Sequence, residues 1–213
     1  MNIHFEMRRR IILASSSPRR KELLSKFLGN NFEVIVPEVN EDEIIIDDPI
    51  ERVKLLAFKK AESIANKVDS GIVIAADTIV VINNEILGKP KSVDEAFRML
   101  KKLSGKKHKV ITALALIDVD NNRKTVEVVE TEVYMRKLSE KEIKMYIESG
   151  EPLGKAGSYA IQGLGAILIE KINGCFFNVV GLPLTKLYEI LNNLDFNLLE
   201  EAVINYEKSS KGF

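Results

Sequence analysis

The sequence predicts an α/β fold built around a mixed β-sheet, and three observations support this. Residues 72–76 and 79–82 are continuous apolar runs rich in β-branched residues, which is typical of a strand buried on both faces. Amphipathic patterns with helix start signals alternate with such strands along the chain. Residues 110–118 and 125–134 form two longer strand patterns joined by a short polar turn, so the sheet is expected to be mixed.

The composition indicates one globular domain over residues 1–213. Of the 213 residues, 46% are hydrophobic and 29% are charged, enough to bury a core. The chain has 31 basic and 31 acidic residues, which argues against a nucleic acid polymer as partner but leaves a small anionic ligand open. The single cysteine, Cys175, is interpreted as a small buried hydrophobe in a reducing compartment. No apolar run approaches the ~20 residues of a membrane span. Residues 1–10 and 207–213 are expected to be a flexible leader and tail.

The first predicted helix carries a cationic cluster. Residues 11–14 form a short buried strand, which leads through three serines into a helix that begins at Pro18. Arg19 and Arg20 fall in its first turn, where the helix dipole disfavours each cation by roughly 0.3–1 kcal/mol. Free backbone N–H groups, serine hydroxyls and two guanidinium groups predict an anion site, with phosphate as the favoured ligand. A solvated arginine pair is the weaker interpretation.

An acidic loop and a long helix follow. Residues 32–36 predict a second strand, and residues 38–48 form a loop with an acidic run, Glu41 to Glu43. Such a run is usually solvated surface, but one of its carboxylates could help to hold Mg²⁺, which prefers oxygen ligands. A helix then starts at Pro49 and extends to about residue 68. Its Lys60 is ambiguous, because most helical lysines face solvent.

Asp77 and Thr78 interrupt the central apolar stretch. Moving an isolated carboxylate out of water is costly, so an aspartate in such a strand should hold a cation, a metal or an activated water. An alternative of equal weight is a carboxylate that caps a loop where the strand breaks. The chain then turns at Asn83 and Asn84, residues that tolerate the positive φ of tight hairpins, and returns to Lys89.

The rest of the chain is expected to supply scaffold and ligand loops. Helices are predicted at 92–105, 139–150, 183–193 and 196–207. Between them, glycines at 154, 157, 163, 165, 174 and 181 mark tight turns or close backbone approach. Gln162 lies between two of these turns, and loops fixed to a sheet are where ligand contacts collect. Neither a P-loop nor a complete dinucleotide-binding glycine motif is present in the sequence.

Four sequence blocks occur in order over residues 11–190: LASSSPRRKELL, AADTIVV followed by LGKP, LSGKKHKVITAL, and EPLGKAGSYAIQGLGAILIEKINGCFFNVVGLPL. Together they resemble the Maf family of nucleoside triphosphate pyrophosphatases. The resemblance implies an elongated mixed β-sheet flanked by helices, with two lobes around a central cleft. It also implies hydrolysis of a nucleoside triphosphate to the monophosphate and pyrophosphate with a divalent metal cation (Mg²⁺, Mn²⁺ or Co²⁺). The resemblance further implies a cytoplasmic protein, and many members of the family are homodimers.

The resemblance also implies roles for individual residues. Asp77 matches the family's proton acceptor. Arg19, Thr78 and Gln162 match its substrate-specificity positions, in the combination of the subgroup that acts on dTTP and UTP. Ser15, Arg20, Lys60 and Lys89 match positions that hold the phosphates. Glu41 matches an acid beside the site and is the expected metal ligand.

The residues themselves support the same chemistry. Attack of water on the α-phosphorus must offset about four negative charges, which arginines, lysines and Mg²⁺ can do electrostatically. Asp77 would orient and deprotonate the water. The alternative is a nucleotide-binding regulator of cell division, a septum formation inhibitor without essential catalysis. Such a protein needs the cations but not the acid, so the sequence favours the enzyme. A housecleaning role against modified nucleotides is plausible.

Overall fold

The computed structural model of the chain describes residues 9–210. Of the leader and tail that are expected to be flexible, residues 1–8 and 211–213 lie outside these described residues. Within them, Arg9 and Arg10 form ion pairs with Asp118 and Glu33, and the last helix continues to Ser210.

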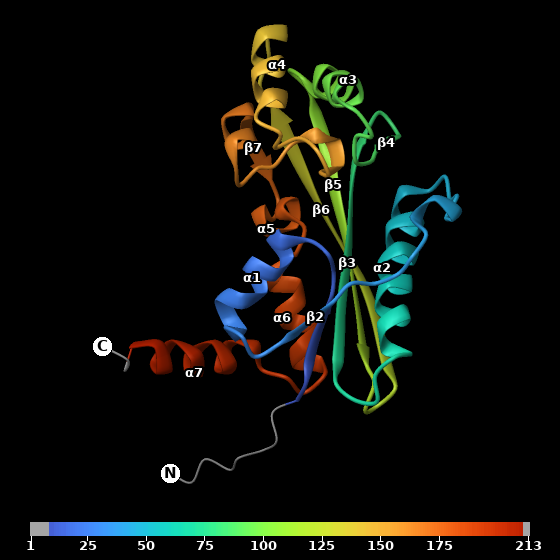
Figure 1. Cartoon of the computed structure of the whole chain (residues 1–213), viewed down its shortest axis with the longest axis vertical. Coiled ribbons are helices and arrows are strands. Elements are labelled where there is room, and N and C mark those ends of the chain that lie inside the picture. The colour runs from blue at the N-terminus through green and yellow to red at the C-terminus, as the bar shows by residue number, and fades with distance from the viewer. Residues whose placement is uncertain (1–8, 211–213) are drawn as a thin grey trace.

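An elongated sheet of seven strands forms the centre of the described chain (Figure 1). Its strands are β1 (Ile11–Ala14), β2 (Glu33–Ile35), β3 (Ile72–Ile82), β4 (Glu85–Leu87), β5 (Lys107–Asp118), β6 (Arg123–Met135) and β7 (Ile169–Asn173). The helices are α1 (Pro18–Leu28), α2 (Pro49–Ala65), α3 (Val93–Leu103), α4 (Glu140–Glu148), α5 (Phe176–Val180), α6 (Leu184–Asn193) and α7 (Leu198–Ser210). Short 3₁₀ turns, η1 (Glu41–Glu43), η2 (Ala156–Ser158) and η3 (Leu164–Leu168), lie in the connections.

The sheet is mixed, which confirms the predicted fold class. Its strand order is β2-β1-β3-β5-β6-β7, and β4 pairs with one end of β3. β1 is parallel to β2 and β3, whereas β3, β5, β6 and β7 are joined by antiparallel pairs. The helices gather in two lobes: α3 and α4 lie toward one end of the long strands, and α1, α6 and α7 toward the other (Figure 1).

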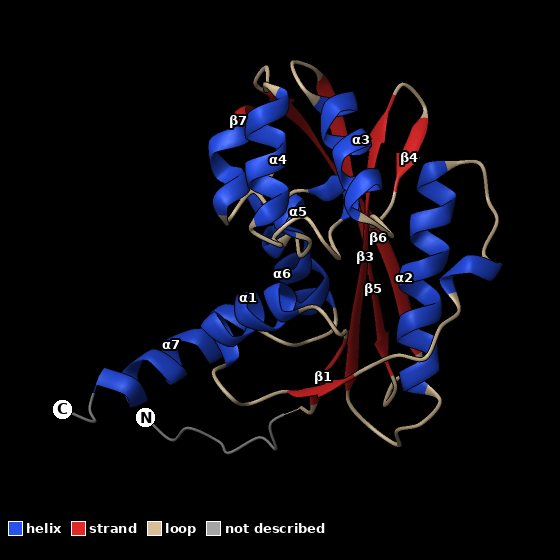
Figure 2. Cartoon of the chain, turned by 45° about the horizontal axis from the view of Figure 1, so that its top comes forward, coloured by secondary structure: helices blue, strands red, loops and turns tan. Residues whose placement is uncertain are grey.

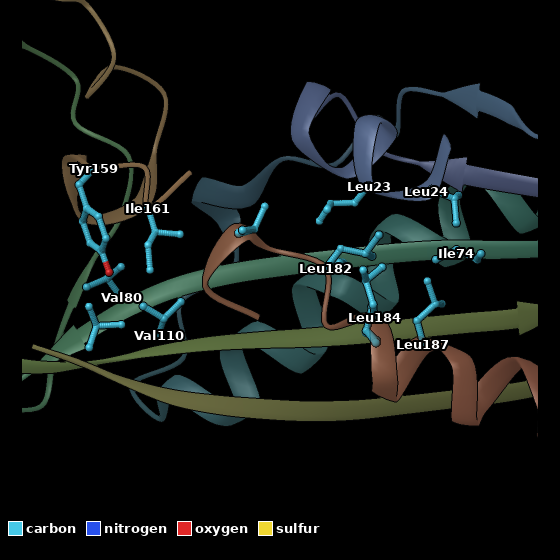
Figure 3. Packing of buried hydrophobic residues seen from close by; sticks show 14 of the residues in the cluster. Leu23, Leu24, Ile74, Val80, Val110, Tyr159, Ile161, Leu182, Leu184 and Leu187 are labelled. Carbon is cyan, nitrogen blue, oxygen red and sulfur yellow. The ribbon is translucent and has the colours of Figure 1, made fainter. Parts of the chain in front are cut away.

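Side chains of β3 alternate between two apolar cores, because successive residues of a strand point to opposite faces. Ile72 and Ile74 pack with residues of α1, α3, α4 and α6, whereas Val73, Ala75 and Ile79 pack with residues of α2. Figure 2 shows α2 on one side of the sheet and α1 and α6 on the other, and Figure 3 shows the α1 and α6 leucines around Ile74. Fully burying one leucine or isoleucine side chain stabilises the fold by about 1.5–3 kcal/mol, so both cores fix the orientation of β3. The membership of the two cores shows that the odd-numbered residues of β3 face α2.

One edge of β3 has a gap at the middle of the strand. β1 pairs with residues 72–75 and β4 with residues 80–82, while β5 covers the other edge continuously. Within the described chain, no strand pairs with residues 76–79 on the β1 side. β3 itself runs unbroken through Asp77. The interpretation that Asp77 caps a strand break is therefore wrong: the carboxylate lies inside the strand, beside a gap between neighbouring strands.

The local sequence signals produce most of the predicted helix starts and turns. Asp48 accepts hydrogen bonds from the first amides of α2, and Ser139 and Glu142 form a complete capping box in α4. Asn83 and Asn84 have φ values of 49° and 64° in the turn into β4. Helix α5 was not predicted, because its 5 residues are too few to show a helical period.

Candidate active site

A pocket of about 220 Å³ opens at the gap in the β3 edge. It is lined by all the site residues that the sequence analysis selected, although they come from separate helices, strands and loops. These residues are Ser15, Arg19, Arg20, Glu41, Lys60, Asp77, Thr78, Lys89 and Gln162. The fold thus gathers the predicted residues in one place, and their individual roles stay predictions.

Lys60 links two carboxylates of the pocket. Helix α2 packs on the face of β3 that carries the odd-numbered side chains, so Lys60 meets Asp77 there. Lys60 Nζ lies 2.5 Å from Asp77 Oδ1 and 2.7 Å from Glu41 Oε1. Lys60 and Asp77 are only 8% and 7% exposed, so removing Lys60 would leave the Asp77 charge buried and poorly compensated. Lys60 is therefore part of the site and not one of the solvent-facing lysines of the helix.

Glu41, at the start of the acidic run, lines the pocket. Its neighbour Glu43 instead accepts a hydrogen bond from Asn40. Partial burial alone would raise the pKa of Glu41, but the hydrogen bond from Lys60 and the nearby positive charges outweigh it and lower the pKa. Glu41 is thus ionised at neutral pH and offers carboxylate oxygen to the pocket.

The two arginines of α1 both line the pocket but differ in their contacts. Arg20 donates from Nε to the Gly181 carbonyl at 2.7 Å and from Nη2 to Thr78 Oγ1 at 3.0 Å. Within residues 9–210, the Arg19 guanidinium has no hydrogen-bond partner. Burial lowers the pKa of both arginines, and the charge of Asp77 partly offsets this at Arg20. Both remain protonated at neutral pH, because a guanidinium is a very weak acid.

A chain of hydroxyl groups fixes the hydrogen of Thr78. Thr112 Oγ1 donates to the Asn178 carbonyl at 3.0 Å, which uses its only hydrogen. Thr78 Oγ1 lies 2.9 Å from Thr112 Oγ1 and must therefore be the donor in that bond. The same Thr78 oxygen accepts from Arg20. Thr78 can consequently only accept a further hydrogen bond, and cannot donate one to a ligand.

Ser15 and Lys89 line other parts of the pocket wall. Ser15 is buried, and its Oγ accepts from the Ser17 amide at 3.1 Å, which braces the loop before α1. Lys89 is exposed, next to Gly88, whose carbonyl accepts from the Gly157 amide at 3.0 Å. Within the described chain, the hydroxyl hydrogen of Ser15 and the ammonium of Lys89 have no protein acceptor, so both remain available as donors.

Gln162 lies at the exposed rim of the pocket. Its turn is closed by a hydrogen bond of 3.3 Å from the Gly163 amide to the Ala160 carbonyl. The carboxamide is thus carried by a turn that lines the same pocket as the cationic start of α1, and not by a strand or an α-helix.

Two further lining residues, Lys155 and Tyr159, were missed from the sequence. The Tyr159 hydroxyl lies 2.8 Å from His108 Nε2, and burial lowers the pKa of His108 to about 4, so this histidine is neutral at pH 7. His108 therefore supports the pocket wall from behind. Nothing in the spacing of Lys155 and Tyr159 distinguishes them from other residues of a glycine-rich loop, so only the fold reveals them.

A mixed sheet with a cationic pocket around a buried carboxylate defines an α/β protein with a site for a polyanionic ligand. The profile of the family described as Maf-like protein matches residues 10–194, and the chain belongs to this family. The dTTP/UTP pyrophosphatases of Methanococcoides burtonii and Ruminiclostridium cellulolyticum are each 47% identical, over 91% and 90% of this chain and 100% of theirs. The Ham1 protein structure from Staphylococcus aureus has 18% identity and a TM-score of 0.43, covering 59% of this chain and 71% of that chain.

Proposed function

We propose that this protein hydrolyses nucleoside triphosphates, dTTP and UTP in preference, to the nucleoside monophosphate and pyrophosphate. The observation that carries the proposal is the contact of Lys60 with both Asp77 and Glu41 inside a pocket that is otherwise cationic. A regulator that only binds nucleotides needs the cations, but carboxylates beside a triphosphate would repel it. Carboxylates at this point are instead useful for a reaction, so the cell-division regulator without catalysis is the less favoured function.

Asp77 is the proposed proton acceptor. Its Oδ1 takes the hydrogen bond from Lys60, which leaves Oδ2 to orient a water molecule and accept its proton. The water oxygen forms a bond to the α-phosphorus while the bond from that phosphorus to the bridging oxygen breaks. Pyrophosphate is the leaving group, and the nucleoside monophosphate is the other product.

The phosphates would be held by donors on several sides of the pocket. About four negative charges must be offset, and fixed cations in a partly buried site do this more effectively than water. Lys60 is fixed by its carboxylate partners and Arg20 by Thr78 and Gly181. The proposed phosphate-binding residues are Ser15, Arg20, Lys60 and Lys89.

A divalent cation fits the ligands of this pocket. Asp77 and Glu41 both contact the Lys60 ammonium, so the two carboxylates lie near enough to each other for a divalent cation beside Lys60 to use one or both of them. Within the described residues, no group of three or more His, Cys, Asp or Glu side chains could hold a metal alone. Mg²⁺ is commonly held by one or two carboxylates together with substrate phosphates, which suits this arrangement. We propose Glu41 as the protein ligand of a divalent cation, Mg²⁺, Mn²⁺ or Co²⁺. When bound, this cation would neutralise part of the negative charge of the triphosphate.

Base selection is assigned to Arg19, Thr78 and Gln162. Uracil and thymine present an N–H beside carbonyl groups, and a carboxamide can accept from that N–H and donate to a carbonyl. Thr78 accepts only, so it would take a hydrogen bond from an N–H or O–H of the substrate. The similarity to two dTTP/UTP pyrophosphatases supports this choice of bases.

The proposed setting is the cytoplasm, with the protein as a homodimer. The free cysteine, Cys175, suits a reducing compartment. Between residues 9 and 210, no helix has both the length and the apolar character to cross a bilayer.

The proposal is tested by a pyrophosphate-release screen. UTP, dTTP, CTP, GTP, ITP and modified triphosphates are each assayed with Mg²⁺, Mn²⁺ or Co²⁺, with EDTA as the metal-free control. We expect UTP and dTTP to give the highest kcat/KM, with one pyrophosphate per monophosphate and no orthophosphate. Tight UTP binding without product under every metal condition would instead support the regulator. A preference for ITP or another purine triphosphate would reject the assigned bases but keep the pyrophosphatase.

A further inference from the structure

Glu151 has no role in the reaction as described, yet its carboxylate is surrounded by donors. It accepts hydrogen bonds from the Tyr146 hydroxyl at 2.8 Å and from the amides of Leu164 and Gly165 at 2.9 Å each. The Tyr146 hydroxyl in turn accepts from the Ala160 amide at 3.1 Å. Glu151 and Tyr146 thus hold the backbone on both sides of residues 161–163.

The backbone held in this way is the turn that presents Gln162 to the pocket. Tyr146 fixes Ala160 at the start of the turn, and Glu151 fixes Leu164 just after its end. Gln162 is itself exposed, and within the described chain its carboxamide has no hydrogen-bond partner, so the position of the carboxamide depends on the backbone beneath it.

The glycines of this loop show how closely the backbone approaches the carboxylate. A Cβ atom at Gly163 would lie 2.1 Å from Glu151 Oε2, and one at Gly165 would lie 2.6 Å from the Tyr146 hydroxyl. Gly163 has a φ of −110°, so its need for glycine comes from this contact and not from a left-handed backbone. The loop is therefore shaped around the Glu151 and Tyr146 side chains.

The charge state of Glu151 suits the role. Burial alone would raise its pKa, but the hydrogen bonds from Gly165, Tyr146 and Leu164 outweigh burial and lower the pKa. Glu151 is thus an ionised carboxylate, which only accepts hydrogen bonds. Burial and the bond to Glu151 raise the pKa of Tyr146, so this hydroxyl keeps its proton and remains a donor.

We propose that Glu151 is a positioning residue for base selection: together with Tyr146 it fixes the turn that holds Gln162 against the base. This inference rests on the proposed function, because it concerns how that pocket distinguishes one base from another. Glu151 acts through the backbone of residues 160–165 and does not touch the substrate.

The test compares UTP with CTP in the full-length protein carrying Glu151→Gln. The amide keeps one acceptor oxygen but turns an NH₂ group toward backbone donors, so the turn should loosen. We expect the ratio of kcat/KM for UTP to that for CTP to fall about tenfold, mainly through a higher KM for UTP. Glu148→Gln makes the same chemical change at an exposed site on α4 and should leave the ratio unchanged.

A double-mutant cycle separates positioning from general stability. In a Gln162→Ala background, adding Glu151→Gln should not change the UTP to CTP ratio further, because both changes act on the same contact. An unchanged ratio in the single variant, or an equal loss for UTP and CTP through kcat, would overturn the inference. If Glu151→Gln does not fold, Tyr146→Phe decides: a smaller fall in the ratio supports positioning, and an unchanged ratio rejects it. Should the wild type bind nucleotides without hydrolysing them, the proposed function fails, and the ratio of dissociation constants in the same variants still tests Glu151.

Discussion

The strand side of the pocket (Lys60, Asp77 and Thr78) and its loop side (residues 151–165) are built in different ways. On the strand side, β3 and α2 are fixed by cores on both faces of the sheet, so the direction of each side chain follows from the fold. On the loop side, neither a β-strand nor an α-helix carries Gln162, and its turn is held by hydrogen bonds to Glu151 and Tyr146. The proposed proton acceptor thus lies on a strand packed on both faces of the sheet, whereas the proposed base-selecting Gln162 lies on a turn that is held by hydrogen bonds.

This difference predicts two kinds of variants. Changes at Lys60 and Asp77 on the strand side should reduce the reaction for every base, because these residues are proposed to hold the phosphates and to accept the proton. Changes on the loop side should alter the ratio between bases and leave kcat largely intact. Each prediction below tests one part of this contrast, from the largest expected effect to the smallest.

The largest effect is expected for Asp77→Asn. The amide is similar in size and still offers an oxygen to Lys60, but it cannot accept a proton from water. We expect kcat to fall by about 10²–10⁴ for UTP and CTP alike, with little change in UTP affinity. Pyrophosphate release, calorimetric UTP binding and circular dichroism measure these three properties. Asp69→Asn, at an exposed position, is the matched control. A wild-type rate in Asp77→Asn would show that another group accepts the proton.

The next effect separates the two arginines of α1. Arg20→Gln breaks bonds to Gly181 and Thr78, so the free energy of unfolding should fall by about 1–3 kcal/mol. Arg19→Gln removes a cation from a helix start, and the Arg19 guanidinium has no hydrogen-bond partner within residues 9–210, so the free energy of unfolding should stay constant or rise by up to about 1 kcal/mol. Urea unfolding measures both, and the KM for UTP should rise in both. Equal changes in the free energy of unfolding would mean that the hydrogen bonds of Arg20 to Gly181 and Thr78 do not stabilise the fold.

The arginine pair also shows where sequence-based prediction ends. The sequence identified both residues, because two cations at a helix start are unfavourable without a ligand. It could not separate them, because the partners of Arg20 lie 58 and 161 residues away along the chain. Asp77 was easier to find, since a carboxylate between β-branched runs stands out. The alternation along β3 then explains why it faces α2, but the gap in the sheet edge needs the strand pairing.

The loop side was the least predictable part of the site. The role of Gln162 was assigned through the family resemblance, and the glycines around it were interpreted as tight turns or close backbone approach, of which Gly163 and Gly165 show the second. The group that they approach, Glu151, was not identified, because a single glutamate at the end of a helix has no distinguishing pattern. Its role depends on hydrogen bonds to residues 13 and 14 positions further along the chain. Local helix, strand and turn propensities do not predict hydrogen bonds between residues this far apart in the chain.

A smaller effect is expected from the hydroxyl chain on the strand side. Thr78→Val has nearly the same shape but cannot accept from Arg20 or donate to Thr112. We expect kcat/KM for UTP to fall about tenfold, with the Thr78→Ser variant close to wild type because it keeps the hydroxyl. Steady-state kinetics of the two variants provide the comparison. A serine variant as impaired as the valine variant would show that the methyl group, and not the hydroxyl, matters.

The smallest effect concerns the stability of the protein in acid. The folded state lowers the pKa of Glu41, so this group stabilises the fold fully above its unfolded pKa, and the contribution is lost as pH falls through the lowered folded pKa. The Glu41 side chain is 41% exposed, so solvent screening should limit the contribution to less than about 1 kcal/mol. Urea unfolding between pH 7 and pH 3 should therefore show a small excess stability of wild type over Glu41→Gln near neutrality that disappears in acid. Glu38→Gln, at a side chain that is 84% exposed, is the control for the loss of a surface carboxylate. Parallel stability curves for wild type and Glu41→Gln would mean that the ion pair with Lys60 does not stabilise the folded protein, and that Glu41 is kept for the ligand alone.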